Sequence, residues 1–103
     1  NGLPYGVRKN VELARALCTS PKILLLDEPS SGLTNEETND LGFWIKDIQS
    51  ILKITIIMIE HDMSFVNKVS DRILALNYGE ILASGLPSEI KEDAGVKAAY
   101  MGE

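Results

Sequence analysis

An aliphatic run that ends in two adjacent carboxylates constrains the fold of this chain more than any other feature. Ile23 to Leu26 are four consecutive aliphatic residues, and Asp27, Glu28 and Pro29 follow them directly. Such a run is typical of a strand buried in a parallel sheet, and ligands of open α/β sheets bind at the carboxyl ends of the strands. Two acids at that position can divide the work of nucleotide hydrolysis: one organises Mg²⁺, and the other orients or polarises a water. The alternative is a pair of solvated acids in a loop.

Helical and strand patterns alternate along the rest of the chain. Thr34 and Glu37 form a capping box before a helix, Gly79 can take a positive φ in a hairpin turn, and Pro87 suits a first helical position after the poor N-cap Leu86. The alternation predicts parallel core strands flanked by helices, with an antiparallel hairpin added. The expected elements are helices over 7–18, after Thr34, and over 63–69, 87–92 and 93–100, and strands over 22–26, 54–60, 72–76 and 81–84.

Composition limits the classes of protein that fit. A length of 103 residues allows at most one modest domain, and a net charge of −5 argues against nucleic acid as a main partner. No apolar stretch reaches the roughly 20 residues needed to cross a bilayer, so we expect no direct membrane insertion. Cys18, the single cysteine, excludes an internal disulfide and fits a reducing compartment. Its helical spacing from Val11 and Ala14 predicts core packing, with a reactive thiol as the alternative.

His61 is the single histidine, and it follows Glu60 at the end of the second aliphatic run. The carboxyl ends of neighbouring parallel strands meet at one edge of a sheet, so we expect His61 on the same rim as Asp27. There it can donate a hydrogen bond to a transferring phosphate. The alternative is a packed or surface histidine, and a zinc site would need more histidine or cysteine than the chain has.

Two loops are candidate nucleotide contacts. Leu3, Pro4, Tyr5, Gly6 and Val7 precede or open a helix, whose first N–H groups and partial positive charge suit a phosphate. A glycine turn before a helix is common, and a plain N-terminal stop explains it equally. Ser31 and Gly32 lie in the loop that follows the acids, where they can sense them; the alternative is a connector ending in a helix cap.

Taken together and in this order, these motifs resemble the ATP-binding cassette ATPases. Residues 3–17 look like the family signature motif and its helix, 23–29 like Walker B with its catalytic glutamate, 31–34 like the D-loop, and 59–63 like the switch-histidine segment. A narrower match is to the ATPase subunits of branched-chain amino acid importers, with Leu-Pro-Tyr-Gly in the signature, Ile-Glu-His-Asp-Met at the switch and a tail similar to 99–103. The resemblance implies a partial P-loop NTPase fold with ATP and Mg²⁺ as cofactors.

The resemblance also implies roles and partners. Glu28 would activate the attacking water, His61 would contact the transferring phosphate, and Asp27 would hold Mg²⁺ through water. The signature would face a nucleotide held by a second ATPase subunit, with the D-loop residues beside it. Transmembrane permease subunits would hold the assembly on the cytoplasmic face of the membrane, where it would power import of a small solute.

The chain departs from the family in several places. Pro4 replaces the serine of Leu-Ser-Gly-Gly-Gln, Tyr5 a glycine, Val7 the glutamine and Thr34 the D-loop aspartate; Val7 also differs from the importer type. The phosphate-cradling motif G-x-x-x-x-G-K-[ST], the Gln loop and the adenine-stacking aromatic do not occur. In the family all three precede the signature.

The chain therefore looks like the C-terminal part of one nucleotide-binding domain, and we expect it to be inactive alone. Its expected parts are a signature helix over 1–20, a Walker B to switch-histidine segment over 21–62, and a hairpin with helices over 63–103. Two alternatives remain open: a soluble non-transport cassette ATPase acting on DNA ends or the ribosome, and a non-catalytic interaction module that retains part of the fold.

Overall fold

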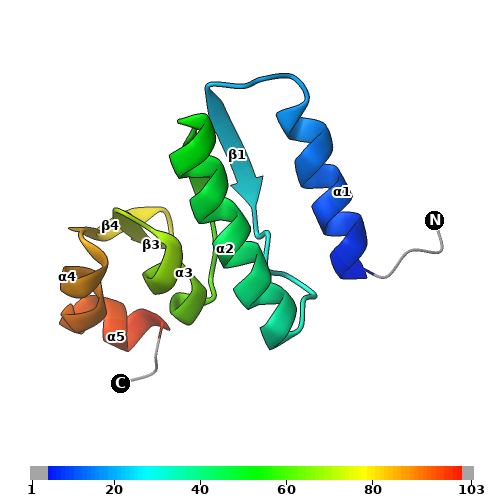
Figure 1. The fold of residues 1–103 in the computed structure, drawn as a ribbon. Coiled ribbons are helices and arrows are strands. Elements are labelled where there is room, and N and C mark those ends of the chain that lie inside the picture. Colours follow the sequence, from blue (N-terminus) through cyan, green and yellow to red (C-terminus); the bar gives the residue numbers. More distant parts are fainter. Residues whose placement is uncertain (1–4, 101–103) are drawn as a thin grey trace. The chain divides into compact units, whose positions relative to one another are not determined.

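The computed structural model describes residues 5–100, which belong to two compact units, Asn1–Glu60 and His61–Glu103. Helices and strands alternate through the first unit, and short helices accompany a hairpin in the second (Figure 1). The first unit contains α1 (Tyr5–Leu17), β1 (Ile23–Asp27), α2 (Asn35–Leu52) and β2 (Thr55–Ile59). The second contains α3 (Met63–Val69), β3 (Ile73–Asn77), β4 (Glu80–Gly85), α4 (Pro87–Glu92) and α5 (Ala94–Tyr100).

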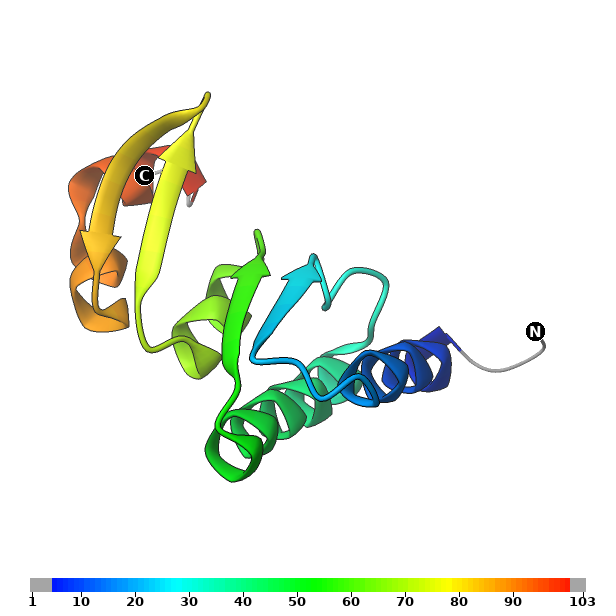
Figure 2. The same ribbon diagram turned by 90° about the horizontal axis from the view of Figure 1, so that it is seen from above.

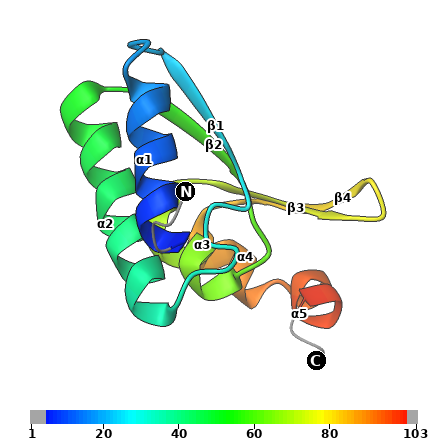
Figure 3. The same cartoon turned by 90° about the vertical axis from the view of Figure 1, so that its right-hand side faces the viewer.

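The first unit is a parallel strand pair with helices on one face. β1 and β2 pair in a register that runs from Ile23 opposite Thr55 to Asp27 opposite Ile59. Both helices lie on the same side of this sheet (Figure 2), as the orthogonal view in Figure 3 confirms. The core between the layers consists of Leu13, Leu24, Leu41, Ile45, Ile48 and Ile54. The predicted parallel core with flanking helices is therefore confirmed.

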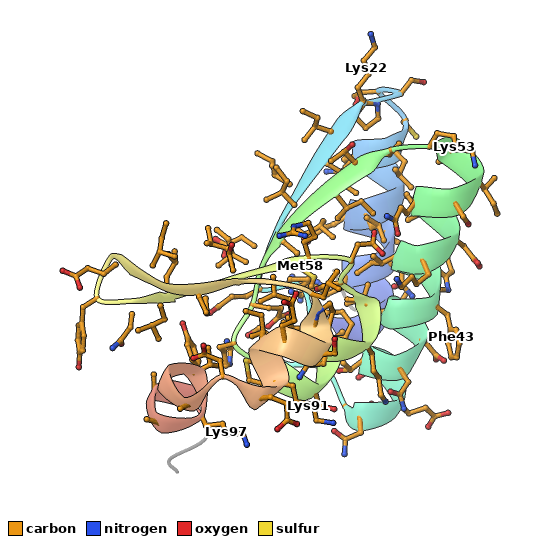
Figure 4. The ribbon with its side chains drawn as sticks, turned by 90° about the vertical axis from the view of Figure 1, so that its left-hand side faces the viewer. Lys22, Phe43, Lys53, Met58, Lys91 and Lys97 are labelled. Carbon is orange, nitrogen blue, oxygen red and sulfur yellow. The ribbon has the colours of Figure 1, made fainter. Side chains whose placement is uncertain are left out.

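Local rules explain where α2 begins and ends. The Glu37 N–H donates to Thr34 Oγ1 at 3.1 Å, and the Thr34 N–H donates to Glu37 Oε1 at 2.9 Å, which closes the predicted capping box. The helix ends at Leu52, because Lys53 takes a left-handed conformation with φ 56°. Phe43 projects from the outer side of α2, away from the sheet (Figure 4).

The second unit is an antiparallel hairpin covered by short helices. Tyr78 and Gly79 have φ values of 49° and 78°, the two positive values that a type I′ turn requires. α4 contacts both strands, α5 contacts β4, and Ile90 and Val96 supply the most buried side chains of this unit. The Tyr100 hydroxyl donates to the Leu76 carbonyl, which fastens the end of α5 to β3. The predicted hairpin and both helices after it are confirmed.

Several predicted core positions are exposed. Cys18 is exposed, so its assignment to the core is wrong, and Val7 and Val11 on the same helix face are exposed too. Leu13 is the buried apolar side chain of α1 instead. The apolar residues at helical spacing on α2 divide in the same way: Leu41, Ile45 and Ile48 are buried, while Trp44, Ile51 and Leu52 are exposed.

The two core strands are buried on one face only, contrary to the expectation. Leu25 is 71% exposed and Ile59 64% exposed, and both belong to the face that α1 and α2 do not cover. Leu24, on the opposite face, is buried. Side chains alternate between the faces of a strand, so a single helical layer leaves half of each aliphatic run uncovered.

Candidate functional site

The predicted catalytic glutamate, Glu28, and the predicted magnesium ligand, Asp27, lie where β1 ends. Asp27 is the last residue of the strand and pairs with Ile59, the last residue of β2. Glu28 follows in a left-handed conformation with φ 47°, and both acids are exposed. The predicted placement of these acids at the carboxyl edge of the sheet is thus found in the first unit.

Three hydrogen bonds fix the peptide groups of Glu28. Its N–H donates to the Ile59 carbonyl at 2.7 Å, and its carbonyl accepts from the Ser31 N–H at 3.1 Å. Lys9 Nζ donates to the same carbonyl at 3.4 Å, from α1. A left-handed conformation at a residue with a side chain costs roughly 1–3 kcal/mol and persists only where the surroundings over-determine it. These bonds contribute to holding Glu28 in that conformation, and they set the direction in which its side chain leaves the backbone.

The loop after the acids is pinned at Ser30. Ser30 is 9% exposed, and both its N–H and its hydroxyl donate to Glu60 Oε2, at 2.9 Å and 2.6 Å. The Leu33 N–H then donates to the Ser30 carbonyl at 3.2 Å, which leads the chain into the cap of α2. Sequence reasoning missed both Ser30 and Glu60 as site residues. The sequence did contain one signal for Glu60, because this carboxylate directly follows the second aliphatic strand and directly precedes His61.

The predicted signature residues are described only in part. Leu3 and Pro4 lie outside the described residues, and α1 begins at Tyr5. Gly6 is buried, and a Cβ built on it would lie 2.7 Å from Glu37 Cδ, so the Glu37 side chain would have to move to admit a larger residue there. Val7 is exposed. A phosphate contact by this segment stays a prediction.

The remaining predicted residues differ in how the structure places them. Ser31 and Gly32 are exposed in the loop after Glu28, and Gly32 has φ 78°. His61 is exposed and is the first residue of the second unit, two positions after the pairing partner of Asp27. Its meeting with the acids stays a prediction.

The donor chemistry at the end of β1 fits a magnesium ion. Magnesium binds through one or two carboxylates and completes its shell with water and phosphate oxygens, and Asp27 offers an exposed carboxylate for that purpose. Residues 5–100 contain no group of three or more histidine, cysteine or acidic side chains able to hold a metal ion by themselves. None of the helices within the same range combines the length and the apolar character needed to cross a membrane.

Comparisons with known proteins agree on one family. The ABC transporter family matches residues 1–31 of the chain. The high-affinity branched-chain amino acid transport ATP-binding protein BraF of Pseudomonas aeruginosa is 44% identical over 101 residues. That match covers 98% of this chain and 40% of BraF, so the chain spans about two fifths of the length of this relative.

Solved structures show the same fold. An ATP-binding cassette of an ABC transporter, in its ADP conformation, superposes with a TM-score of 0.87 at 30% identity. The superposed region covers 99% of this chain and 41% of the solved chain. CbiO1 from Clostridium perfringens, part of the transporter complex CbiONQ, superposes with a TM-score of 0.84 at 31% identity and covers 94% of this chain and 39% of its own.

Proposed function

This chain belongs to the ATP-binding cassette (ABC) transporter family, and we propose that it supplies the hydrolytic acids of an ATPase that powers import of branched-chain amino acids. The observation that carries the proposal is the placement of Glu28. It follows the end of β1, beside the end of β2, with its backbone held by the Ile59 carbonyl. The name of the 44% identical relative supports the choice of solute.

Each acid has a distinct role in this proposal. Glu28 accepts a proton from the water that attacks the terminal phosphate, and its fixed backbone keeps the carboxylate aimed at that water. Asp27 holds Mg²⁺ through water at the end of the strand. When bound, the ion neutralises charge that develops on the phosphate oxygens. His61 donates a hydrogen bond to the transferring phosphate.

Contacts to the nucleotide complete the proposed site. The signature residues Leu3, Pro4, Tyr5, Gly6 and Val7 face a nucleotide held by a second ATPase subunit, since the first N–H groups of a helix attract phosphate. Ser31 and Gly32, in the loop after Glu28, adjoin the same interface. Transmembrane permease subunits carry the solute and keep the ATPase at the cytoplasmic face of the membrane.

Substitution of the proposed base tests this function. A complete cassette subunit carrying these 103 residues would be reconstituted with its membrane subunits, and ATP hydrolysis and uptake of radiolabelled leucine would be measured. Glu28→Gln should lower hydrolysis about 10²-fold or more, because it removes the base, while binding of ATP persists. Glu80→Gln, at an exposed carboxylate on β4, is the control and should leave both activities unchanged.

Two outcomes would contradict the proposal. Hydrolysis that survives Glu28→Gln would show that another group activates the water, and an active subunit that does not move branched-chain amino acids would exclude the solute. The 103-residue chain alone should not turn over ATP, because its sequence has no phosphate-cradling motif. Turnover that scales with its concentration and is lost on Glu28→Gln would overturn that expectation.

A further inference from the structure

The exit of β2 holds the acid loop at two successive residues. The Ile59 carbonyl accepts from the Glu28 N–H at 2.7 Å, and Glu60 Oε2 accepts from the N–H and the hydroxyl of Ser30 at 2.9 Å and 2.6 Å. Three hydrogen bonds therefore join residues 59–60 to residues 28–30, and Glu60 supplies the acceptor for two of them. Pro29, between the bonded positions, is buried.

We propose that Glu60 is a positioning residue for Glu28, acting through Ser30. This inference rests on the proposed role of Glu28 as the base in ATP hydrolysis. Hydrogen bonds to a carboxylate are shorter and stronger than those between neutral groups, and the 2.6 Å bond from the Ser30 hydroxyl is of this kind. Glu60 thus anchors the loop two residues beyond the catalytic acid.

The left-handed backbone of Glu28 explains why this anchor matters for catalysis. With φ at 47°, Glu28 adopts a conformation that a residue with a side chain leaves readily once its constraints are removed. Loss of the Glu60 carboxylate frees the Ser30 end of the loop, and relaxation of Glu28 then turns its side chain away from the attacking water. A displacement of about 1 Å in a reacting group can lower a rate about 10²-fold.

Three substitutions in the complete cassette subunit test the assignment. Glu60→Ala removes the acceptor and should lower kcat about 10- to 100-fold, with KM for ATP within about twofold of the original value. Glu60→Gln keeps a side-chain oxygen that can accept both bonds, and it should restore most of kcat. Ser30→Ala removes only the hydroxyl bond and should have an intermediate effect that adds little to Glu60→Ala. Glu80→Ala, at an exposed carboxylate on β4 and outside every proposed site segment, is the matched control.

Amide hydrogen exchange gives a readout that is independent of ATP hydrolysis. The N–H groups of Glu28 and Ser30 should exchange faster in Glu60→Ala and at the original rate in Glu60→Gln, because only the first substitution opens the loop. If the unsubstituted subunit hydrolyses no ATP, the proposed function fails, and exchange alone then decides whether Glu60 fixes the loop.

The following results would overturn the inference. They are an unchanged kcat in Glu60→Ala, an equal loss of kcat in Glu60→Ala and Glu60→Gln, and unchanged exchange of the Glu28 N–H in Glu60→Ala. If Glu60→Ala does not fold, Ser30→Ala and Glu60→Gln still decide the matter: the first should lower kcat, and the second should not.

Discussion

Substitution of Gly6 by alanine should lower the stability of the chain, although alanine ordinarily stabilises a helix relative to glycine. Gly6 lies in the first turn of α1 and is buried. A Cβ built there would lie 2.7 Å from Glu37 Cδ and closer still to one carboxylate oxygen. The other oxygen of Glu37 accepts from the Thr34 N–H at 2.9 Å, so a shift of this carboxylate away from Gly6 strains the capping box of α2.

The structure allows an estimate of the effect of Gly6→Ala. In a helix alanine is favoured over glycine by roughly 0.5–1 kcal/mol. Against that gain stand loss of the capping hydrogen bond, about 0.5–1.5 kcal/mol, and the strain of overpacking, about 1–3 kcal/mol. The two costs together exceed the gain by about 0.5–4 kcal/mol, and we expect Gly6→Ala to lower the free energy of unfolding by an amount in that range. In a Glu37→Ala background the obstacle is gone, and the same substitution should raise it by up to about 1 kcal/mol.

Urea unfolding followed by far-ultraviolet circular dichroism measures this cycle. All variants must be compared at one protein concentration, because association changes the apparent stability. Glu36→Ala is the matched control: it removes the neighbouring exposed carboxylate and should leave the cost of Gly6→Ala unchanged. Equal effects of Gly6→Ala in the original and Glu37→Ala backgrounds, or a gain in stability in the original one, would refute the steric argument.

Two further predictions concern exposed residues. Tyr78 is 98% exposed with φ 49°, so Tyr78→Asn, which gives the Asn-Gly pair favoured in type I′ turns, should stabilise the chain by about 0.5–1 kcal/mol in urea unfolding. Tyr78→Phe should not, and equal effects of the two would contradict the turn argument. The 103-residue chain should self-associate through the uncovered face of its sheet, and light scattering measures this. Leu25→Lys, on that face, should weaken the association, whereas Phe43→Lys, on the outer side of α2 (Figure 4), should not. A compact monomer of the unsubstituted chain would contradict the expectation.

Local chemistry made much of the fold predictable. The capping box at Thr34, the positive φ of Gly79 and the start of α4 at Pro87 all depend on groups within four residues of each other. Such contacts form in any surroundings that let the element form, so a single sequence contains the information. The carboxyl end of β1 follows equally from a continuous aliphatic run that stops at charged residues.

Burial was less predictable, because helical spacing identifies an apolar face of a helix but does not show whether another element packs against it. Cys18 and Val11 share such a face on α1, and Trp44 and Ile51 extend another on α2, yet all four are exposed. Distant pairing has the same difficulty. The bonds from Ser30 to Glu60 depend on the register that sets Asp27 opposite Ile59, and no local pattern specifies that register.

The same register connects the acid rim with the uncovered face of the sheet. Ile23, Leu25 and Asp27 alternate onto one face of β1, and Ile59 lies opposite Asp27, so the carboxylate proposed to hold magnesium borders the aliphatic surface that α1 and α2 leave open. Parallel sheets are ordinarily covered on both faces, and within the first unit α1 and α2 cover one of them (Figure 2). Whatever layer packs on the other face therefore adjoins Asp27 at its edge. A layer that covers this face would therefore also border the proposed nucleotide site.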